Sequence, residues 1–377
     1  MTGDAVYLDF AATTPMDPRV ADAMLECAGA DGTFANPSSV HIAGRRAAAV
    51  VEEARAALAS LMRTEPGRLT WTSGATESDN LAIRGAALAR AHRGKHLISM
   101  PTEHKAVSET FRALEKEGFE LTWLAPDSGG LLSLEALSRA LRDDTQLVSV
   151  MHVNNETGVI QDICAIGELC REHDVLFHTD AAQSVGKLDI DLGAMPVDLV
   201  SLTGHKFYAP KGIGALYIAA RPGLRIFPIL YGGGQEKRLR PGTLPVHQIA
   251  GLGKAAAIAA RERQANYRHV SAMRDRLWHG IADLRFDSLV AGNDRFAVAQ
   301  PDRCEDVPPL AVLIFQERDV AGAVRFVLDA DHLGGDIQLG ALEVDEAVTL
   351  LVPTASVLGG DDAVVVTPAF FGFRPQQ

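Results

Sequence analysis

The side chains with the clearest chemical potential in this chain are a lysine and an aspartate that lie close to apolar runs. Lys206 comes shortly after residues 197–201, and Asp180 ends residues 175–180. A lysine just past a buried strand can form a Schiff base if burial and nearby positive charge keep its amine nucleophilic. An acid at the end of a buried strand needs a cation or a hydrogen-bond donor, and a heterocyclic cation would serve. Taken alone, Lys206 is better explained as a surface lysine in a Gly- and Pro-rich turn.

A turn of small residues indicates a second kind of chemistry. Residues 73–80 follow the predicted strand 69–72 and lead into an apolar helix, with Thr76 at the helix start. Free backbone N–H groups and the positive end of the helix dipole suit a phosphate at such a start. The hydroxyls of Ser73 and Thr76 would be extra donors. The turn matches neither a Walker loop nor the GxGxxG fingerprint, and a simple capping box explains it equally well.

Two further polar residues follow predicted strands. His104 comes after residues 95–100, and Asn155 comes after residues 146–153, a nearly continuous apolar run typical of a central parallel strand. In a doubly wound sheet the carboxyl ends of the strands meet at one crevice. We therefore expect these side chains to share one site with the lysine and the aspartate.

The order of the expected elements predicts an α/β fold. Strands and helices alternate, which indicates a mostly parallel sheet with helices on both faces, and residues 214–218 should return antiparallel. Residues 7–15 are expected to form a short strand that runs into a polar turn. The other expected strands include residues 121–124, and the expected helices are residues 19–28, 43–62, 111–117, 134–141 and 163–173.

The combined set of side chains fits one cofactor. Pyridoxal 5′-phosphate needs a lysine for its aldehyde, an anion for its pyridinium nitrogen, a phosphate cradle and a ring to stack on its face. Lys206, Asp180, the turn at residues 73–80 and His104 supply these four in turn. One such residue would be chance, but several that suit a single cofactor predict its binding.

Composition excludes several classes of partner. The 377 residues are 47% hydrophobic and 22% charged, which is ordinary for a globular protein. The net charge of −12 argues against nucleic acid or an anionic membrane surface. We expect no metal site, because the four cysteines show no CxxC pairing: Cys27, Cys164, Cys170 and Cys304. No apolar run is long enough for a bilayer and residues 1–4 lack signal-peptide features, so a cytoplasmic location is expected.

The chain resembles the class V pyridoxal-phosphate enzymes, and specifically the cysteine desulfurases of the NifS/IscS type, from about Tyr7 to about Arg276. This resemblance implies the type I fold of PLP-dependent transferases. The motifs that carry it are residues 36–41, 72–80, 102–104, 154–158, 180–186, 204–206, 232–236 and 240–245.

The resemblance implies a role for each matching residue of the ring site. Lys206 would hold the cofactor covalently, Asp180 would keep the pyridine nitrogen protonated, and His104 would stack on the ring and move protons. These three are the expected catalytic residues. Asn155 and Gln183 would contact the ring substituents.

The same resemblance implies how the phosphate is held. Ala75, Thr76, Thr203 and His205 would bind it within one subunit, and Thr243 would reach the phosphate of the other subunit. The last role implies a homodimer.

The C-terminal part departs from the family. We expect a PLP-binding large domain with an N-terminal arm at residues 1–260, and an atypical, β-rich small domain at residues 261–377. The family's Ser-Gly-Ser-Ala-Cys type of loop is absent, its substrate-carboxylate arginine has no match, and the one downstream cysteine is Cys304. Expected strands after about residue 282 are residues 311–315, 323–328, 337–342, 347–352 and 363–367. A diverged domain, a replacement or a reading-frame change would each explain this segment.

The expected activity is that of a PLP-dependent, cysteine-desulfurase-like sulfurtransferase. It would convert L-cysteine to L-alanine and a persulfide for iron–sulfur cluster or thio-cofactor assembly, with a sulfur-acceptor or scaffold protein as a further partner. Loss of the acceptor loop would impair it. The alternatives are a class V β-lyase or aminotransferase that needs no thiol nucleophile, and a catalytically silent PLP-binding homologue.

Overall fold

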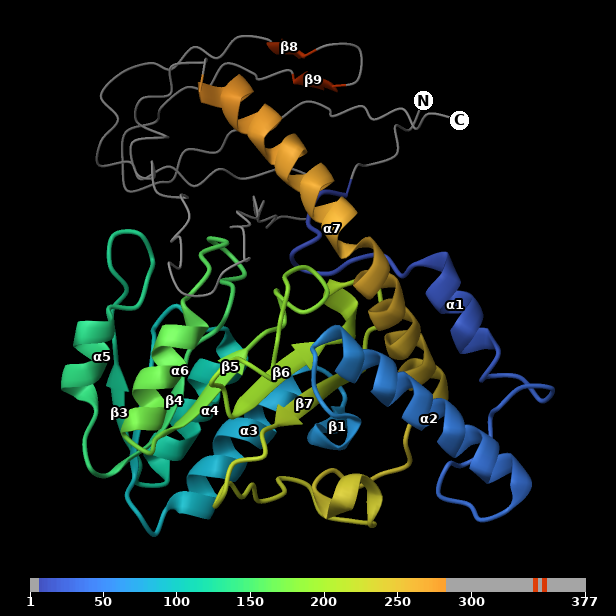
Figure 1. Ribbon diagram of the computed structural model, residues 1–377, viewed down its shortest axis with the longest axis horizontal. Coiled ribbons are helices and arrows are strands. Elements are labelled where there is room, and N and C mark those ends of the chain that lie inside the picture. The colour runs from blue at the N-terminus through green and yellow to red at the C-terminus, as the bar shows by residue number, and fades with distance from the viewer. Residues whose placement is uncertain (1–6, 283–341, 345–347, 351–377) are drawn as a thin grey trace, which may run out of the picture.

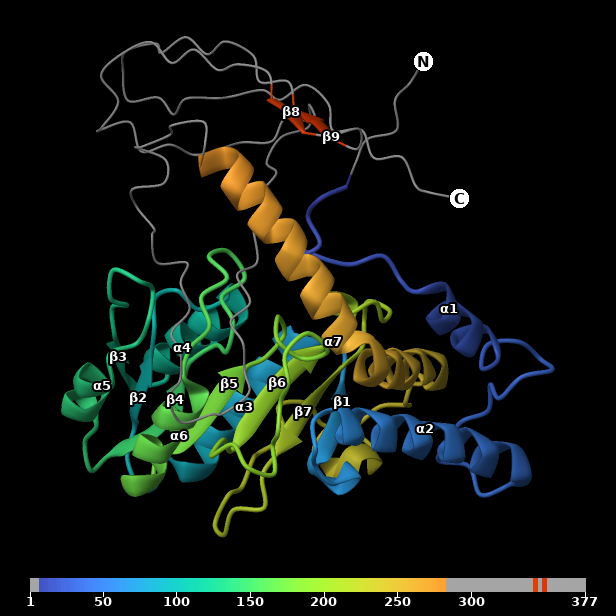
Figure 2. The ribbon, with the colours of Figure 1, turned by 45° about the horizontal axis from the view of Figure 1, so that its top comes forward.

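The computed structural model describes residues 7–282, 342–344 and 348–350, and its main feature is a seven-stranded sheet (Figure 1). From one edge to the other the strand order is β1, β7, β6, β5, β4, β2, β3 (Figure 2). Only β7 runs against its neighbours β1 and β6, which confirms the mostly parallel sheet with an antiparallel return. The strands are β1 (Leu69–Thr72), β2 (His96–Ser99), β3 (Glu120–Trp123), β4 (Thr145–Ser149), β5 (Leu176–Asp180), β6 (Leu199–Thr203) and β7 (Gly214–Ile218).

Helices cover both faces of this sheet. They are α1 (Pro18–Leu25), α2 (Ile42–Leu61), α3 (Ala75–Arg90), α4 (Lys105–Lys116), α5 (Leu134–Ala140), α6 (Ile163–Glu172) and α7 (Val246–Ala282). Three short 3₁₀ turns accompany them, at Pro66–Arg68, Gly204–Lys206 and Gln235–Arg238. Helix α4 begins earlier than residue 111, where the sequence placed it, because the His104 Nδ1 atom caps it by accepting a hydrogen bond from Ala106 N at 3.1 Å.

Alternation along the strands divides the apolar core in two. In β2, Leu97 belongs to the cluster that includes residues of α3 and α4, while Ile98 belongs to the other cluster, which includes residues of α2, α6 and α7. In β4, Leu147 and Val148 divide in the same way. Successive side chains of a strand point to opposite faces, so fully apolar strands need a helical layer on each side.

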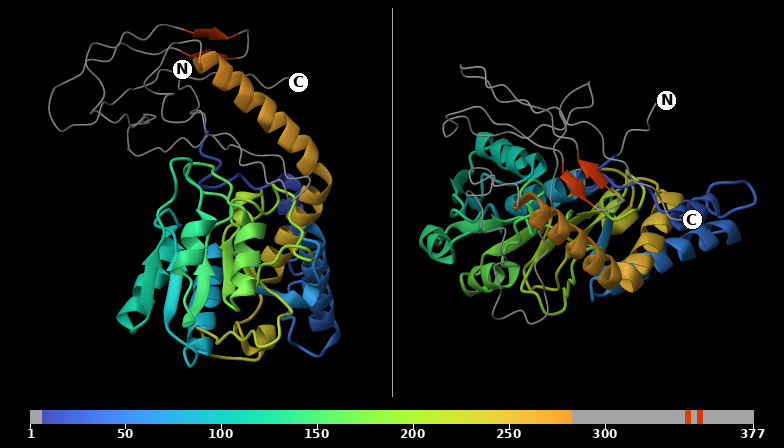
Figure 3. Two further views of the ribbon diagram at one scale, coloured as in Figure 1. Left: turned by 60° about the vertical axis from the view of Figure 1, so that its left-hand side comes forward. Right: turned by 90° about the horizontal axis from the view of Figure 1, so that it is seen from above.

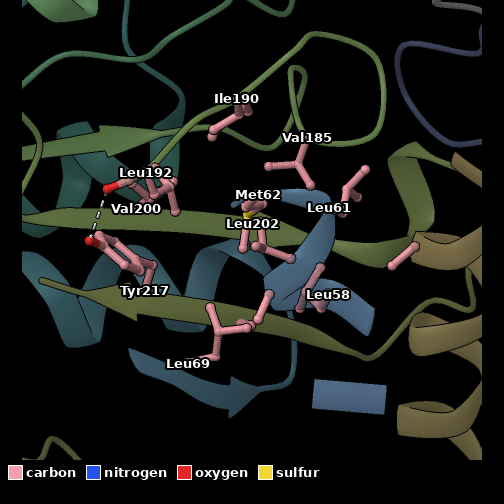
Figure 4. Packing of buried hydrophobic residues seen from close by; sticks show 14 of the residues in the cluster. Leu58, Leu61, Met62, Leu69, Val185, Ile190, Leu192, Val200, Leu202 and Tyr217 are labelled. Atoms are coloured by element: carbon pink, nitrogen blue, oxygen red, sulfur yellow. Dashed lines mark hydrogen bonds between the residues drawn. The ribbon is translucent and has the colours of Figure 1, made fainter. Parts of the chain in front are cut away.

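Figure 4 shows the second of these cores where α2 meets the sheet. Leu58, Leu61 and Met62 at the end of α2 pack against Val200 and Leu202 of β6. These side chains are at most 5% exposed. The end of α2 is therefore fixed against the strand that leads to Lys206.

The longest helix extends beyond the sheet. Helix α7 packs on α1 and α2 over its first half, and its second half projects away from the strands (Figure 3). It passes residue 260 without a break, so the predicted boundary between the two domains lies within a continuous helix. In the part of the chain that the structure describes, no helix is both long and apolar enough to cross a bilayer.

Most of the predicted C-terminal strands lie outside the described residues: residues 311–315, 323–328 and 363–367. The described pieces there are β8 (Leu342–Val344) and β9 (Val348–Leu350), which pair antiparallel. The first piece overlaps the predicted strand 337–342 only at Leu342, and the second lies inside the predicted strand 347–352.

The prediction of a strand at the start of residues 7–15 is wrong, because the backbone of this part of the chain hydrogen-bonds to the turn around Lys206 and not to a strand of the sheet. Thr14 N donates to His205 O at 2.9 Å, and Asp17 N donates to Tyr208 O at 3.1 Å. The segment therefore lies along the turn that carries Lys206 instead of joining the sheet. We call residues 9–17 the N-terminal strap.

Candidate active site

A cavity of about 760 Å³ opens at the carboxyl ends of the parallel strands. Of the ten residues predicted to bind the cofactor, all but Thr243 line it: Ala75, Thr76, His104, Asn155, Asp180, Gln183, Thr203, His205 and Lys206. Its volume is in the range that small-molecule cofactors occupy. The fold thus brings together the five positions selected by their place after a strand and four that the family resemblance added.

Lys206 ends the 3₁₀ turn that follows β6 and directs its amine into the cavity. The Nζ atom donates a hydrogen bond to Ala11 O of the N-terminal strap. Burial lowers the pKa of Lys206, although Asp180 and Asp9 act in the opposite direction. A lowered pKa increases the fraction of neutral amine, which is the form that attacks an aldehyde.

Asp180 lies at the end of β5 and is 4% exposed. Its Oδ1 atom accepts a hydrogen bond from Ala182 N at 2.9 Å. Burial raises the pKa of this carboxyl, and the nearby Asp79 raises it further. Among the described residues Asp180 forms no ion pair with a lysine or arginine, so a cationic ring nitrogen would stabilise its charged form.

The start of helix α3, which lines the same cavity, suits an anion. Helix α3 starts at Ala75, directly after Gly74, and Gly74 has no side chain that could cap it. The first backbone N–H groups of the helix therefore have no side-chain acceptor from the cap position and can bind an anion. The register pairs Gly214 with both Thr72 and Thr203, which brings the ends of β1 and β6 together. A side chain at Gly214 would meet Gly74 Cα at 2.7 Å, so glycine is needed for this approach.

His205 and an ion pair support this end. The Nδ1 atom of His205 lies 3.1 Å from Thr13 Oγ1, and burial together with Lys206 lowers the pKa of His205 to about 4. The imidazole is therefore neutral at physiological pH and acts as a hydrogen-bonding group. Glu77 accepts from Ser73 N at 2.7 Å and pairs with Arg240 at 2.8 Å. This pair ties the turn after β1 to the loop that carries Thr243.

Thr243 is the one predicted residue that does not line the cavity. It is exposed in the loop between Arg240 and the start of α7. Its predicted contact is with another subunit, and that contact stays a prediction.

The remaining predicted residues are presented by well-bonded turns. His104 uses Nδ1 to cap α4, so its neutral ring carries the proton on Nε2. Asn154 accepts from Glu156 N and Thr157 N at 2.9 and 2.8 Å, which fixes the turn that holds Asn155. Gln183 donates from Nε2 to Ala11 O at 2.9 Å.

Several cavity-lining residues were missed from the sequence. Asp9, Ala11, Ala12 and Thr13 of the N-terminal strap all line the cavity. The polar turn at Thr13 and Thr14 was visible in the sequence, but nothing local indicated that it meets a segment nearly 200 residues away. Met151, Glu156 and Lys211 also contribute.

The residues present fit pyridoxal phosphate. The cavity is lined by an amine of lowered pKa, a buried carboxyl that forms no ion pair with a lysine or arginine of the described residues, and a helix start without a side-chain cap. Each matches one chemical demand of the cofactor: its aldehyde, its ring nitrogen and its phosphate.

Comparison with known proteins gives consistent results. Residues 6–294 match the model of the family described as Aminotransferase class-V. Over 280 residues the chain is 55% identical to a protein named cysteine desulfurase IscS from Serratia proteamaculans, covering 74% of this chain and 69% of that one.

Solved structures show the same similarity. A NifS-like protein superposes with a TM-score of 0.71 at 37% identity, over 74% of this chain and 76% of that one. A structure described as SspA in complex with cysteine superposes with a TM-score of 0.64 at 45% identity, over 66% of this chain and 72% of that one. With its sheet, its lysine-bearing cavity and these relatives, the chain belongs to the aminotransferase class V family.

Proposed function

We propose that this protein is a PLP-dependent cysteine desulfurase. In the overall reaction the C–S bond of L-cysteine breaks and the sulfur is transferred to an acceptor thiol, which becomes a persulfide. The carbon that loses the sulfur takes up the proton that the thiol gives up, and the product is L-alanine. The persulfide would supply iron–sulfur cluster or thio-cofactor assembly through an acceptor protein. The names of the relatives and the cysteine complex of a related structure support this substrate.

The cofactor, when bound, supplies an electron sink for the carbanion that develops at the substrate's α-carbon. Lys206 would attach it and release it when the substrate amine arrives. Asp180 would hold the proton on the ring nitrogen. His104 would stack on the ring and exchange protons through Nε2, since its Nδ1 is used in capping α4.

The rest of the site would bind and orient. Ala75, Thr76, Thr203 and the neutral His205 would hold the phosphate, and Asn155 and Gln183 would contact the ring substituents. The observation that carries the proposal is that these positions, drawn from five separate segments, line one cavity around the Lys206 amine.

The covalent attachment is tested by borohydride reduction of the protein loaded with pyridoxal phosphate. Peptide mapping should find the pyridoxyl group on Lys206, and Lys206→Ala should carry no covalent label. A label on Lys187 or Lys211 instead would contradict the assignment.

The reaction is tested by incubating the loaded protein with L-cysteine and an added small thiol as sulfur acceptor. Equal amounts of alanine and sulfide are expected, because the thiol reduces the persulfide. Turnover of other amino acids in preference to cysteine would contradict the proposed substrate.

One observation favours a second candidate, a β-lyase that needs no thiol nucleophile. Of the three cysteines that the structure describes, Cys27, Cys164 and Cys170, none lines the cavity. Burial raises the pKa of Cys170 to about 12, so that thiol is unreactive. Formation of pyruvate and ammonia in place of alanine would identify the lyase, and cofactor binding without any product would identify a silent homologue.

We also propose that the protein works as a homodimer and in the cytoplasm. The dimer is supported by the similarity of the Gly242–Thr243 turn to the family's contact with the neighbouring phosphate. A monomeric protein with full activity would contradict it.

A further inference from the structure

Lys187 is a partly buried lysine beside the candidate site, with no assigned role. It lies in the turn after β5, where a side chain at Gly186 would meet the Phe207 ring at 2.8 Å, and Gly186 has φ of +80°. The turn is therefore packed against the residue next to Lys206. Within the described residues Lys187 makes no ion pair, and its Nζ atom donates to Gln183 Oε1 at 3.1 Å.

The hydrogen bonds of Gln183 allow only one orientation of its amide. Oε1 accepts from the Lys187 ammonium, and Nε2 donates to Ala11 O at 2.9 Å. A flipped amide would place N–H groups against the ammonium and an oxygen against the carbonyl, so both contacts would be lost. Because Ala11 O also accepts from Lys206, the two lysines are linked through Gln183 and one carbonyl.

This orientation leaves the second N–H of Gln183 free. Gln183 lines the cavity, so that N–H is available to an oxygen of a molecule bound there. Burial, with Lys206 nearby, lowers the pKa of Lys187 to about 8, which leaves the amine mostly protonated at neutral pH and able to donate. With an apolar side chain at position 187, the orientation of the amide would be held by the bond to Ala11 O alone.

We propose that Lys187 is a positioning residue: it orients the Gln183 amide so that an N–H faces the ring of the bound cofactor. The inference rests on the proposed function for the presence of that cofactor. A hydrogen bond donated to a ring oxyanion stabilises the deprotonated form of the bound chromophore. Lys187 should therefore lower the pH at which the bound cofactor changes colour.

The test is a pH titration of the absorption spectrum of the cofactor-loaded protein, in wild type and Lys187→Met. The titration midpoint should rise by about one pH unit in the variant. Lys187→Arg keeps a charged donor and should restore part of the shift. Lys254→Met, which removes an exposed lysine of α7, is the matched control and should titrate as the wild type does.

A double-mutant cycle with Gln183→Ala separates positioning from simple charge. If Lys187 acts through Gln183, then Lys187→Met adds no shift in the Gln183→Ala background. An equal shift in both backgrounds, or an unchanged midpoint in Lys187→Met, would overturn the proposal. If Lys187→Met fails to fold, Lys187→Gln can replace it. This side chain is neutral and too short to reach Gln183 Oε1, so the same shift is expected.

The two proposals fail in different ways. A wild-type protein that acquires no colour with pyridoxal phosphate overturns the proposed function and the role of Lys187 together. A coloured wild type with an unshifted Lys187→Met overturns only the role of Lys187.

Discussion

Three carboxyl groups lie buried close enough to act on one another, and one of them, Asp180, lines the cavity; the others are Asp79 and Glu103. Burial raises the pKa of Asp79 to about 7. The imidazole nearest to it, His178, lies 3.5 Å away, and burial lowers the pKa of that histidine to about 4, so it carries no charge near neutral pH. Burial likewise raises the pKa of Glu103, with Asp180 and Asp79 adding to the effect. Repulsion among the three favours a protonated state for the members that face no cation.

The first prediction concerns Asp79 in the cofactor-free protein. Its folded pKa of about 7 lies above the ordinary value of 3.8, so between these values the folded state holds a proton that the unfolded state has lost. Stability from this group is present below pH 3.8 and is lost as the pH rises toward 7, by about 1.4 kcal/mol per pH unit. The unfolding free energy of the wild type should therefore fall relative to that of Asp79→Asn as the pH rises from 5 to 7. Urea denaturation at several pH values measures it, and a difference independent of pH would contradict the assignment.

At the scale of elements, a buried ion pair joins α2, β1 and the loop that leads to Thr243. The Arg55 guanidinium pairs with Glu236 at 2.8 Å and donates to Leu69 O at 2.9 Å. Glu236 also accepts from Trp71 N at 2.8 Å. Both charged side chains are at most 8% exposed, and Glu236 has φ of +45°, so this contact holds the loop in a conformation that few residues adopt freely.

The second prediction follows from that pair. Glu236→Ala should destabilise the protein by about 3 kcal/mol, because it leaves Arg55 buried without its main partner. Glu52→Ala is the control, since Glu52 is an exposed partner of the same arginine at 3.2 Å and should contribute about 0.5 kcal/mol. Urea denaturation midpoints compare the two, and equal effects would show that burial does not decide the strength of the pair.

Sequence patterns predicted the sheet well and the connections less well. The apolar runs located all seven strands of the sheet, because every strand except the edge strand β3 is largely buried. Four of the five expected helices were found within three residues at each end, and α4 begins six residues earlier than expected. The run at residues 146–153 was predicted as strand throughout, but β4 ends at Ser149. The backbone N–H groups of Val150 and His152 still donate to carbonyl groups of β5. The chain therefore stays buried beside β5 after β4 ends, and the apolar pattern reflects this burial.

The site was predictable where a residue follows a strand and not where it depends on distant segments. Asp180 and Lys206 could be selected because strand ends converge in this class of sheet. Ala11 and Lys187 could not, because a small residue in a turn and a lysine after a glycine are ordinary surface features in sequence. Their importance comes from hydrogen bonds to residues far along the chain or across a turn.

For the whole molecule, the third prediction concerns assembly. Thr243→Val should weaken pyridoxal phosphate binding, because one hydrogen bond to a charged group contributes on the order of 1.5–3 kcal/mol. Mixing Thr243→Val with Lys206→Ala subunits should restore one working site per mixed dimer if Thr243 serves the neighbouring subunit. Cofactor affinity is measured by equilibrium dialysis and subunit state by analytical ultracentrifugation. A monomer that holds the cofactor as tightly as the wild type does would contradict the shared site.

The fourth prediction concerns the sulfur acceptor. Cys304 lies outside the described residues, and its neighbours Glu305 and Asp306 should raise the pKa of its thiol. Losing an oriented nucleophile forfeits roughly 7–11 kcal/mol of proximity advantage. We expect slow alanine formation from cysteine, strong acceleration by added thiol, and the same rates in Cys304→Ser. Rapid alanine formation that this substitution abolishes would identify Cys304 as the acceptor.

The N-terminal strap has a consequence for the order of events during protein synthesis. The Lys206 amine meets Ala11 across 195 positions of sequence, so the N-terminal strap leaves the ribosome well before the residue that it contacts. Contacts so distant in sequence form late, because closing a long loop costs entropy that local contacts do not. The sheet can assemble strand by strand, whereas the reactive lysine is enclosed only when the chain beyond β6 has emerged. Capture of the cofactor is accordingly a late step in maturation.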